Sequence, residues 1–241
     1  MRRTEIIRSP FTFVSVCVII IWVIFVAFKN FLKRYSFLPG ILVLATNLIF
    51  SFVTRLFLGG RDYYDLVTVL DEKIPFLPGF IYIYCLAFLQ WAVCIVALMI
   101  VDRETYFRFC IGLTAANILS GAVFLILPSL MVSRPEFSGG GAVTELLGKF
   151  IFAADTPPRN IFPSVHCSHS WACLRMLFAS KIVPRKFKYL NALFSVAVFL
   201  SVLFVKQHCL VDIPAGILIF EAGLLITKLT GIDKKLMTLN L

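Results

Sequence analysis

The stretch GFIYIYCLAFLQWAVCIVALMIV, residues 79–101, holds 23 residues and no charged side chain. An α-helix needs about 20 apolar residues to cross the roughly 30 Å hydrocarbon core of a bilayer. The stretch therefore predicts a transmembrane helix. It decides the fold class because much of the remaining chain has the same character.

The composition of the whole chain extends this prediction. Of the 241 residues, 60% are hydrophobic and 15% are charged, whereas soluble domains carry about 25% charged residues. We predict an all-α fold, a polytopic membrane helical bundle with six core transmembrane helices and an additional N-terminal helix, in a single membrane-embedded domain, 1–241. The other six apolar runs that predict spans are 10–28, 37–58, 109–132, 164–180, 190–205 and 210–229.

The distribution of basic residues predicts the orientation. The net charge of +10 would suggest nucleic acid in a soluble protein, but in a membrane protein lysine and arginine collect on cytoplasmic loops and meet anionic lipid. The loop KIVPRKFKY, 181–189, has four basic residues and no acid, so we place it in the cytoplasm. The loops 59–78 and 133–163 then face outward, in a multi-pass protein of the cell membrane with no nucleic-acid partner. The sequence does not indicate an oligomeric state.

All three histidines lie in two short segments, NIFPSVHCSHSW (160–171) and KQHCLVDIPAG (206–216). In the predicted topology, the spans at 164–180 and 210–229 begin at the outer face, where the span at 109–132 ends. Residues 134, 164–166 and 208–212 can therefore share one pocket.

These residues suit a phosphate. His208 and Asp212 are four apart, so a helix places them on one face, where the carboxylate can fix the imidazole tautomer and leave the other nitrogen free. Cations and a helix N-terminus bind phosphate groups, and histidine can act as a nucleophile or a proton donor. The candidates to join this pair are His166, Ser164, Arg134, Arg159, Lys206 and Lys149.

The same segments resemble the three motifs of the type 2 phosphatidic acid phosphatase superfamily, which includes lipid phosphate phosphatases and related phosphotransferases. The family pattern is Lys, six residues, Arg-Pro; then Pro-Ser-Gly-His; then Ser-Arg, five residues, His, three residues, Asp. This chain has Arg134-Pro135, the PSVH of 163–166, and Ser201 with His208 and Asp212 at the matching intervals. The resemblance covers the C-terminal half, with 109–229 as the motif-bearing catalytic core.

The resemblance implies an enzyme that needs no cofactor and no metal. His208 would be the nucleophile that forms a phospho-histidine, Asp212 its orienting partner, and His166 the general acid. Arg134 and Ser164 would bind the phosphate of a lipid substrate at the extracytoplasmic face.

Three positions depart from the family pattern. Leu127, Val165 and Val202 replace the first-motif lysine, the second-motif glycine and the third-motif arginine. From their proximity alone, Arg159 or Lys206 would replace the missing cations. Similar changes occur in the branch that resembles inositol-phosphoceramide and sphingomyelin synthases. The chain is therefore expected to be a lipid phosphate phosphatase, with two alternatives: a phosphotransferase to an alcohol or polyol, or a catalytically inactive lipid carrier or binding protein.

Alternative interpretations of single residues are weaker or assign the residue a structural role. Ser164 also fits an ordinary helix N-cap, and we expect His169 to have a packing role. A zinc site formed by His166, Cys167, His169 and Cys173 is disfavoured, because a helix spreads these side chains around its circumference. Arg175 and Glu221 are charges within predicted spans, and we expect them to form a buried ion pair.

Overall fold

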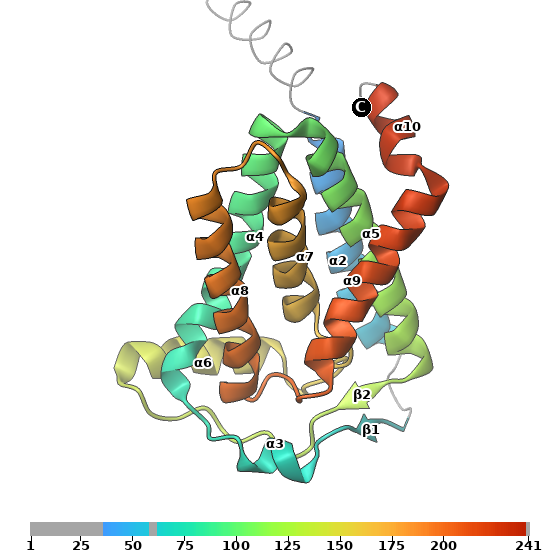
Figure 1. Ribbon diagram of the computed structural model, residues 1–241. Coiled ribbons are helices and arrows are strands. Elements are labelled where there is room, and N and C mark those ends of the chain that lie inside the picture. Colours follow the sequence, from blue (N-terminus) through green and yellow to red (C-terminus); the bar gives the residue numbers. More distant parts are fainter. Residues whose placement is uncertain (1–35, 58–61, 240–241) are drawn as a thin grey trace, which may run out of the picture.

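The computed structural model describes residues 36–57 and 62–239 (Figure 1). The predicted N-terminal span at 10–28 lies outside these residues. Within them the chain forms a helical bundle, which confirms the predicted all-α fold class, whereas the number of six core transmembrane helices stays a prediction. The long helices are α2 (Leu38–Phe57), α4 (Ile81–Val101), α5 (Arg103–Ile126), α7 (Val165–Ala179), α8 (Arg185–Phe204) and α9 (Asp212–Thr230).

Shorter elements lie at the two ends of the bundle. At one end Figure 1 shows the helices α3 (Val69–Lys73) and α6 (Ala142–Ala154) with two strands, β1 (Tyr64–Asp65) and β2 (Ser129–Leu130), which pair in parallel. We call this the strand end, and it includes segments 155–164 and 205–211. At the opposite end lie α10 (Ile232–Thr238), the α4–α5 junction at Asp102 and the α7–α8 connection, 180–184. We call this the α10 end.

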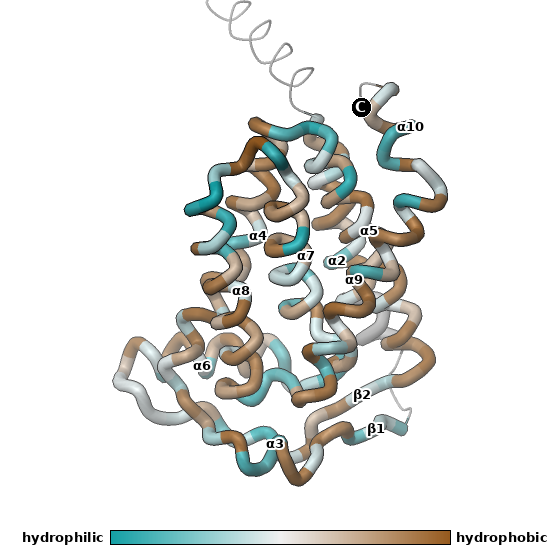
Figure 2. Tube along the Cα trace, in the orientation of Figure 1, coloured by the Kyte–Doolittle hydropathy of each residue, from teal (hydrophilic) through white to brown (hydrophobic). Residues whose placement is uncertain are grey.

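Four helices in the described part of the chain are long and apolar enough to cross a membrane. They are Pro78–Val101, Arg103–Ile126, Arg185–Phe204 and Asp212–Thr230. The apolar part of α2, Leu38–Ser51, is shorter, and α7 has 15 residues. Figure 2 shows hydrophobic residues along the sides of α4, α8 and α9 and hydrophilic residues gathered towards both ends.

The structure corrects the bounds of several predicted spans, and those of one span substantially at both ends. The span expected at 109–132 is α5, which begins at Arg103 and ends at Ile126. Its polar first turn is stabilised because the Asp102 side chain caps the helix, with Oδ1 accepting a hydrogen bond from the Thr105 N–H at 3.1 Å. The helix stops before Pro128, because proline disfavours helical backbone in the residue before it. The prediction from hydropathy misplaced this helix, because hydropathy depends only on apolar content and takes no account of helix caps.

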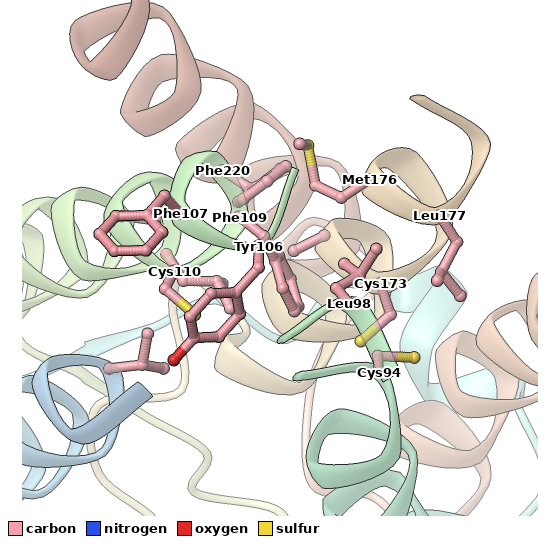
Figure 3. Packing of buried hydrophobic residues seen from close by; sticks show 14 of the residues in the cluster. Cys94, Leu98, Tyr106, Phe107, Phe109, Cys110, Cys173, Met176, Leu177 and Phe220 are labelled. Atoms are coloured by element: carbon pink, nitrogen blue, oxygen red, sulfur yellow. The ribbon is translucent and has the colours of Figure 1, made fainter. Parts of the chain in front are cut away.

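The central helix is α7, which packs against α4, α5, α8 and α9. Its approach to α9 depends on Gly216, where a Cβ atom would collide with the Ser164 carbonyl oxygen and lie 3.1 Å from the Ser168 nitrogen. The core towards the α10 end, shown in Figure 3, is rich in aromatic and sulfur side chains, among them Tyr106, Phe109, Cys173 and Phe220. The six described cysteines are free, and five of them are buried.

A buried polar chain also joins the helices. The Gln90 amide donates to the Asn191 Oδ1 atom at 2.9 Å and to the Ser195 Oγ atom at 2.8 Å, and the Ser195 hydroxyl donates to the Ser170 carbonyl at 2.9 Å. Polar side chains of this kind hold helices together where the surroundings are apolar, because water does not compete for the bonds.

The expected ion pair between α7 and α9 is present. The Arg175 Nε atom lies 3.6 Å from the Glu221 Oε1 atom, which also accepts a hydrogen bond from the Trp171 indole at 2.8 Å. The expectation that the pair is buried is wrong, since the two side chains are 45% and 38% exposed. They lie on the outer face of the bundle, where Trp171 supplies the additional partner.

Candidate functional site

The strand end brings the predicted site segments together. Arg134 follows β2, Ser164 and His166 open α7, and His208 lies in the turn before α9, whose first residue is Asp212. A backbone hydrogen bond from the Ser164 N–H to the Asp212 carbonyl, at 3.3 Å, joins the two histidine-bearing segments directly. The predicted sharing of one end by sequence-distant motifs is therefore confirmed.

The segment before α7 is held by β2. The Asn160 N–H donates to the Ser129 carbonyl at 2.8 Å, and the Phe162 N–H donates to the Ser129 hydroxyl at 2.9 Å. Ser164 is fully buried, and its hydroxyl oxygen accepts a hydrogen bond from the Cys167 N–H at 3.2 Å. The N-cap role of Ser164 is thus confirmed, and its phosphate-binding role stays a prediction.

One ring nitrogen of His208 lies within hydrogen-bond distance of two acceptor oxygens, which fix the ring. Its Nδ1 atom lies 2.7 Å from the Ile161 carbonyl oxygen and 3.1 Å from the Asp212 Oδ2 atom. A carbonyl and a carboxylate only accept, so Nδ1 must carry the proton and a neutral ring keeps its lone pair on Nε2. Asp212, buried completely, is itself held by the Cys209 N–H at 2.8 Å. This arrangement prepares Nε2 as a nucleophile.

Cys209, the neighbour of His208, does not compete for that role. Its side chain is buried, and burial raises the pKa of the thiol above its ordinary value. A thiol that stays protonated is a poor nucleophile.

The second imidazole, His166, is held by aromatic rings. It stacks on Tyr84 with ring centroids 4.1 Å apart and contacts Phe88 and Trp91 at centroid distances of 5.3 and 5.2 Å. Its own centroid lies 6.1 Å from that of His208. The Nε2 atom of His166 is buried and has no hydrogen-bond partner within the described ranges.

A cavity of about 150 Å³ lies between the two imidazoles. Besides His166 and His208, its lining includes Arg159, Gln207, Tyr84 and Asp155. Two of these residues also present buried atoms that lack a partner in the described part of the chain, Arg159 Nε and Gln207 Nε2. Buried polar atoms are almost always hydrogen-bonded. The residues that carry these unpaired nitrogen atoms line one cavity, so they are candidates to bind a ligand with acceptor oxygens.

Arg134 is not among the residues that line this cavity. Its guanidinium binds the Asp155 carboxylate at 3.1 Å and the Asp155 carbonyl at 3.3 Å, and it stacks 4.3 Å above the Phe152 ring. It lines a neighbouring cavity of about 470 Å³ instead. Asp155 also lines the histidine cavity. Arg134 can therefore affect that cavity through its ion pair with the Asp155 carboxylate. The cation that faces the two histidines is Arg159, whose guanidinium lies 5.0 Å from the Tyr63 ring centroid.

Lys206 lies on the other side of His208. A third cavity, of about 430 Å³, is lined by both residues and by Asp71 and Pro135. The Lys206 ammonium donates to the Asp71 carbonyl at 2.7 Å. His208 thus separates two cavities, one lined by the unpaired polar atoms and one larger.

Asp71 is a site residue that sequence reasoning missed. Its Oδ1 atom accepts a hydrogen bond from the Leu210 N–H at 2.6 Å, and its Oδ2 atom accepts one from the Thr68 N–H at 2.9 Å. Asp71 thereby ties α3 to the turn that carries His208. The capping-box spacing of Thr68 and Asp71 is visible in the sequence and could have predicted α3. Nothing in the sequence connects it to residue 210.

The remaining candidates have structural surroundings. The His169 Nδ1 atom lies 3.1 Å from the Val165 carbonyl, and its ring packs on Trp91 at 4.7 Å, as expected for a packing role. Val202, in the position of the third-motif arginine, is fully buried in an apolar cluster. Lys149 pairs with Glu145 on the exposed face of α6. In the part of the chain that the structure describes, no three His, Cys, Asp or Glu side chains are placed to hold a metal ion.

Comparison of the chain with family models, with curated proteins and with solved structures gives no match. The chemistry of the site therefore has to be argued from its own geometry. That geometry offers a nucleophilic nitrogen, a second imidazole and an arginine around one small cavity.

Proposed function

We propose that this protein is an integral-membrane enzyme that removes the phosphate group of a lipid through a phospho-histidine at His208. One observation carries the proposal. The proton of His208 is fixed on Nδ1, so that Nε2 is free next to a cavity with unpaired atoms on Arg159, Gln207 and His166. Phosphate has the acceptor oxygens that this set of donors lacks.

The reaction has two steps. The lone pair of His208 Nε2 attacks phosphorus, the bond from phosphorus to the lipid oxygen breaks, and His166 gives that oxygen a proton. Water then attacks phosphorus, its proton returns to His166, and the nitrogen–phosphorus bond breaks to release phosphate. With 6.1 Å between the ring centroids, one tetrahedral phosphate can contact both rings.

Positive charge for the substrate comes from Arg159, and Arg134 neutralises Asp155 at 3.1 Å. Without Arg134, the Asp155 carboxylate on the cavity wall would repel a phosphate. A negatively charged phosphate in turn favours the protonated form of His166, which the first step requires. Preorganised groups of this kind stabilise the charge of a transferring phosphoryl group.

The surroundings support a substrate in the membrane. Four apolar helices could cross a bilayer, and the basic segment 181–189, which comprises part of the α7–α8 connection and the first turn of α8, lies at the α10 end. The excess of basic residues favours that end as cytoplasmic and the strand end as extracytoplasmic. A lipid phosphate at the outer face would then reach His208 from the side of the bundle.

A phosphotransferase is the second candidate, because His208 also borders the cavity of about 430 Å³. The acceptor hydroxyl would attack phosphorus from the side opposite Nε2, as water does, and this cavity could hold the remainder of an alcohol or polyol that extends past His208. Asp71 and Glu72, which line it, can accept hydrogen bonds from hydroxyl groups.

The decisive experiment is a turnover panel with the purified chain, in EDTA, over lipid phosphates and lipid pyrophosphates with and without glycerol or inositol as acceptor. We expect phosphate release, and we expect His208→Asn to lower it about 10³-fold or more. Asparagine is a suitable replacement because its amide nitrogen can occupy the place of Nδ1 while Nε2 is lost.

His169→Asn is the matched control, since it makes the same change on α7 without touching the cavity, and it should keep activity within about tenfold. Product formation only with an acceptor would identify the transferase. Binding of lipid phosphates with neither release nor transfer would contradict the proposal and identify a carrier.

A further inference from the structure

A fourth cavity, also with charged walls, lies at the α10 end, opposite the histidines. It has a volume of about 320 Å³ and is enclosed by α5, α7, α9 and α10. Four basic side chains line it: Arg108, Arg175, Lys228 and Lys234. The proposed reaction uses none of them.

The two arginines are held in place by acids. Arg108 pairs with Glu104 at 2.9 Å and with Asp233 at 3.4 Å, and Arg175 pairs with Glu221 at 3.6 Å. The bond to Asp233 joins α5 to α10, and the bond to Glu221 joins α7 to α9. These pairs fix the walls of the cavity and neutralise most of its charge.

The two lysines differ from the arginines. Neither Lys228 nor Lys234 has a hydrogen bond or an ion pair to any residue in the ranges 36–57 and 62–239. The cavity and its ion pairs thus contain four basic and three acidic side chains. One net positive charge remains, which matches the single negative charge of a phosphodiester better than the nearly double charge of a phosphomonoester.

The cavity lies close to the ends of the helices that enclose it, where the headgroup region of a bilayer would be. Arg175 lies four residues before the last residue of α7, and Lys228 lies two before the last residue of α9. At about 1.5 Å per residue these positions are roughly 6 and 3 Å inside the helix ends. The apolar part of the lining consists of Met176, Ala179 and Leu224. The α9 surface beside it continues with Leu225 and Leu229, which are 55% and 76% exposed.

We propose that this cavity binds an anionic phospholipid, independently of the reaction at His208. The phosphodiester lies between the ammonium groups of Lys228 and Lys234, and the acyl chains lie along the exposed leucines of α9. Basic pockets between helix ends on the cytoplasmic side suit lipid headgroups of this charge. The shared chemistry is a phosphate anion, so free phosphate is the alternative source that an experiment must separate.

The test uses the full chain in phosphatidylcholine nanodiscs, with and without phosphatidylglycerol, and reads the thermal midpoint and the phospholipids retained in native mass spectrometry. We expect phosphatidylglycerol to raise the midpoint of the wild type and to remain bound. Lys228→Ala/Lys234→Ala should bind it about 30-fold more weakly. Lys228→Arg/Lys234→Arg should keep the binding, which separates loss of charge from loss of folding.

Lys181→Ala/Lys186→Ala is the matched control, because it removes two exposed lysines at the same end that do not line the cavity. Equal loss in this control, or full binding by the Lys228→Ala/Lys234→Ala variant, would overturn the proposal. Inorganic phosphate is the third arm. If millimolar phosphate reproduces the whole shift and phosphatidylglycerol adds nothing, the ligand is free phosphate and not a lipid.

Discussion

The two ends of the bundle differ in how deeply their polar side chains are buried and how firmly hydrogen bonds hold them. At the strand end, His208, Asp212 and Asp71 are buried or nearly so and are each fixed by hydrogen bonds to the backbone. At the α10 end, Arg175 and Glu221 remain 45% and 38% exposed, and Lys228 has no protein partner in the described ranges. Both ends bury polar atoms that lack a partner in the described ranges, among them Arg103 Nε at the α10 end, but at the strand end such atoms belong to residues that line one cavity.

This difference indicates different tasks. A reacting nitrogen must be held in one tautomer and one direction, and hydrogen bonds made before the substrate arrives reduce the cost of reorganisation in the reaction. A long ammonium side chain at a membrane surface keeps its mobility and supplies mainly charge. The strand end therefore suits the proposed chemistry, and the α10 end suits the proposed reversible binding of a lipid.

Among the variants that test this comparison, those of the two arginines at the strand end should have the largest effect. Arg159→Ala removes the cation that lines the histidine cavity, and we expect kcat/KM for a lipid phosphate to fall about 100-fold. Arg134→Ala should also lower it, but for another reason, because it removes the guanidinium that pairs with the Asp155 carboxylate on the cavity wall.

The double variant Arg134→Ala/Asp155→Asn distinguishes these reasons. If Arg134 acts through Asp155, the second substitution should restore most of the activity that the first removes, whereas Asp155→Asn should not rescue Arg159→Ala. Steady-state kinetics with thermal unfolding as a folding check measures both. A double variant as inactive as Arg134→Ala would instead show that Arg134 contacts the phosphate, as the sequence resemblance implies.

A smaller effect should come from the contact that holds the two histidine segments together. Gly216→Ala places a Cβ atom against the Ser164 carbonyl, so α7 and α9 must separate, at a cost of about 2 kcal/mol in the free energy of unfolding. The shift also moves Asp212 relative to His166, and activity should fall with stability. Gly79→Ala is the control, since a Cβ atom there meets nothing within 4 Å. If the two variants have equal thermal midpoints, the close approach at Gly216 does not support the site.

Much of the fold could be predicted from apolar runs, because a membrane span depends on length and hydrophobicity. The predicted boundaries were wrong where a helix begins with polar residues. The helices α5 and α8 begin at Arg103 and Arg185, each several residues before the apolar run. The amphipathic helix α6 was missed within a stretch treated as a loop, since its apolar residues cover only one face.

In the candidate site, the sequence could predict only those relations that follow from the spacing and order of its residues. The four-residue interval between His208 and Asp212 indicated their contact, and the motif order indicated a shared end. The sequence could not show that the Arg134 guanidinium faces Asp155, or that Gln207 and Arg159 line the histidine cavity. Those facts depend on the path of segment 155–163 over β2, which no local pattern specifies.

The smallest predicted effect concerns the α10 end, where one carboxylate is as well fixed as those at the strand end. Asp102 accepts hydrogen bonds from the Ser180 hydroxyl at 2.6 Å and the Thr105 hydroxyl at 2.8 Å. Burial acts to raise the pKa of Asp102, but these bonds and that of the Thr105 N–H outweigh it and hold the pKa below the ordinary value of 3.8.

Because the folded pKa of Asp102 is the lower one, the carboxylate stabilises the fold fully above pH 3.8, and this contribution is lost as the pH falls through the folded value. Asp102→Asn should cost about 1 kcal/mol at neutral pH, the usual effect of a weakened N-cap, and should lose less stability than the wild type on acidification. Thermal unfolding from pH 7 to pH 3 measures both effects.

Glu104→Gln is the control, because it removes an exposed carboxylate one turn from its partner Arg108 and should change the midpoint very little. Equal acid sensitivity of Asp102→Asn and the wild type would show that other carboxylates dominate, and that the α10 end is stabilised without this cap.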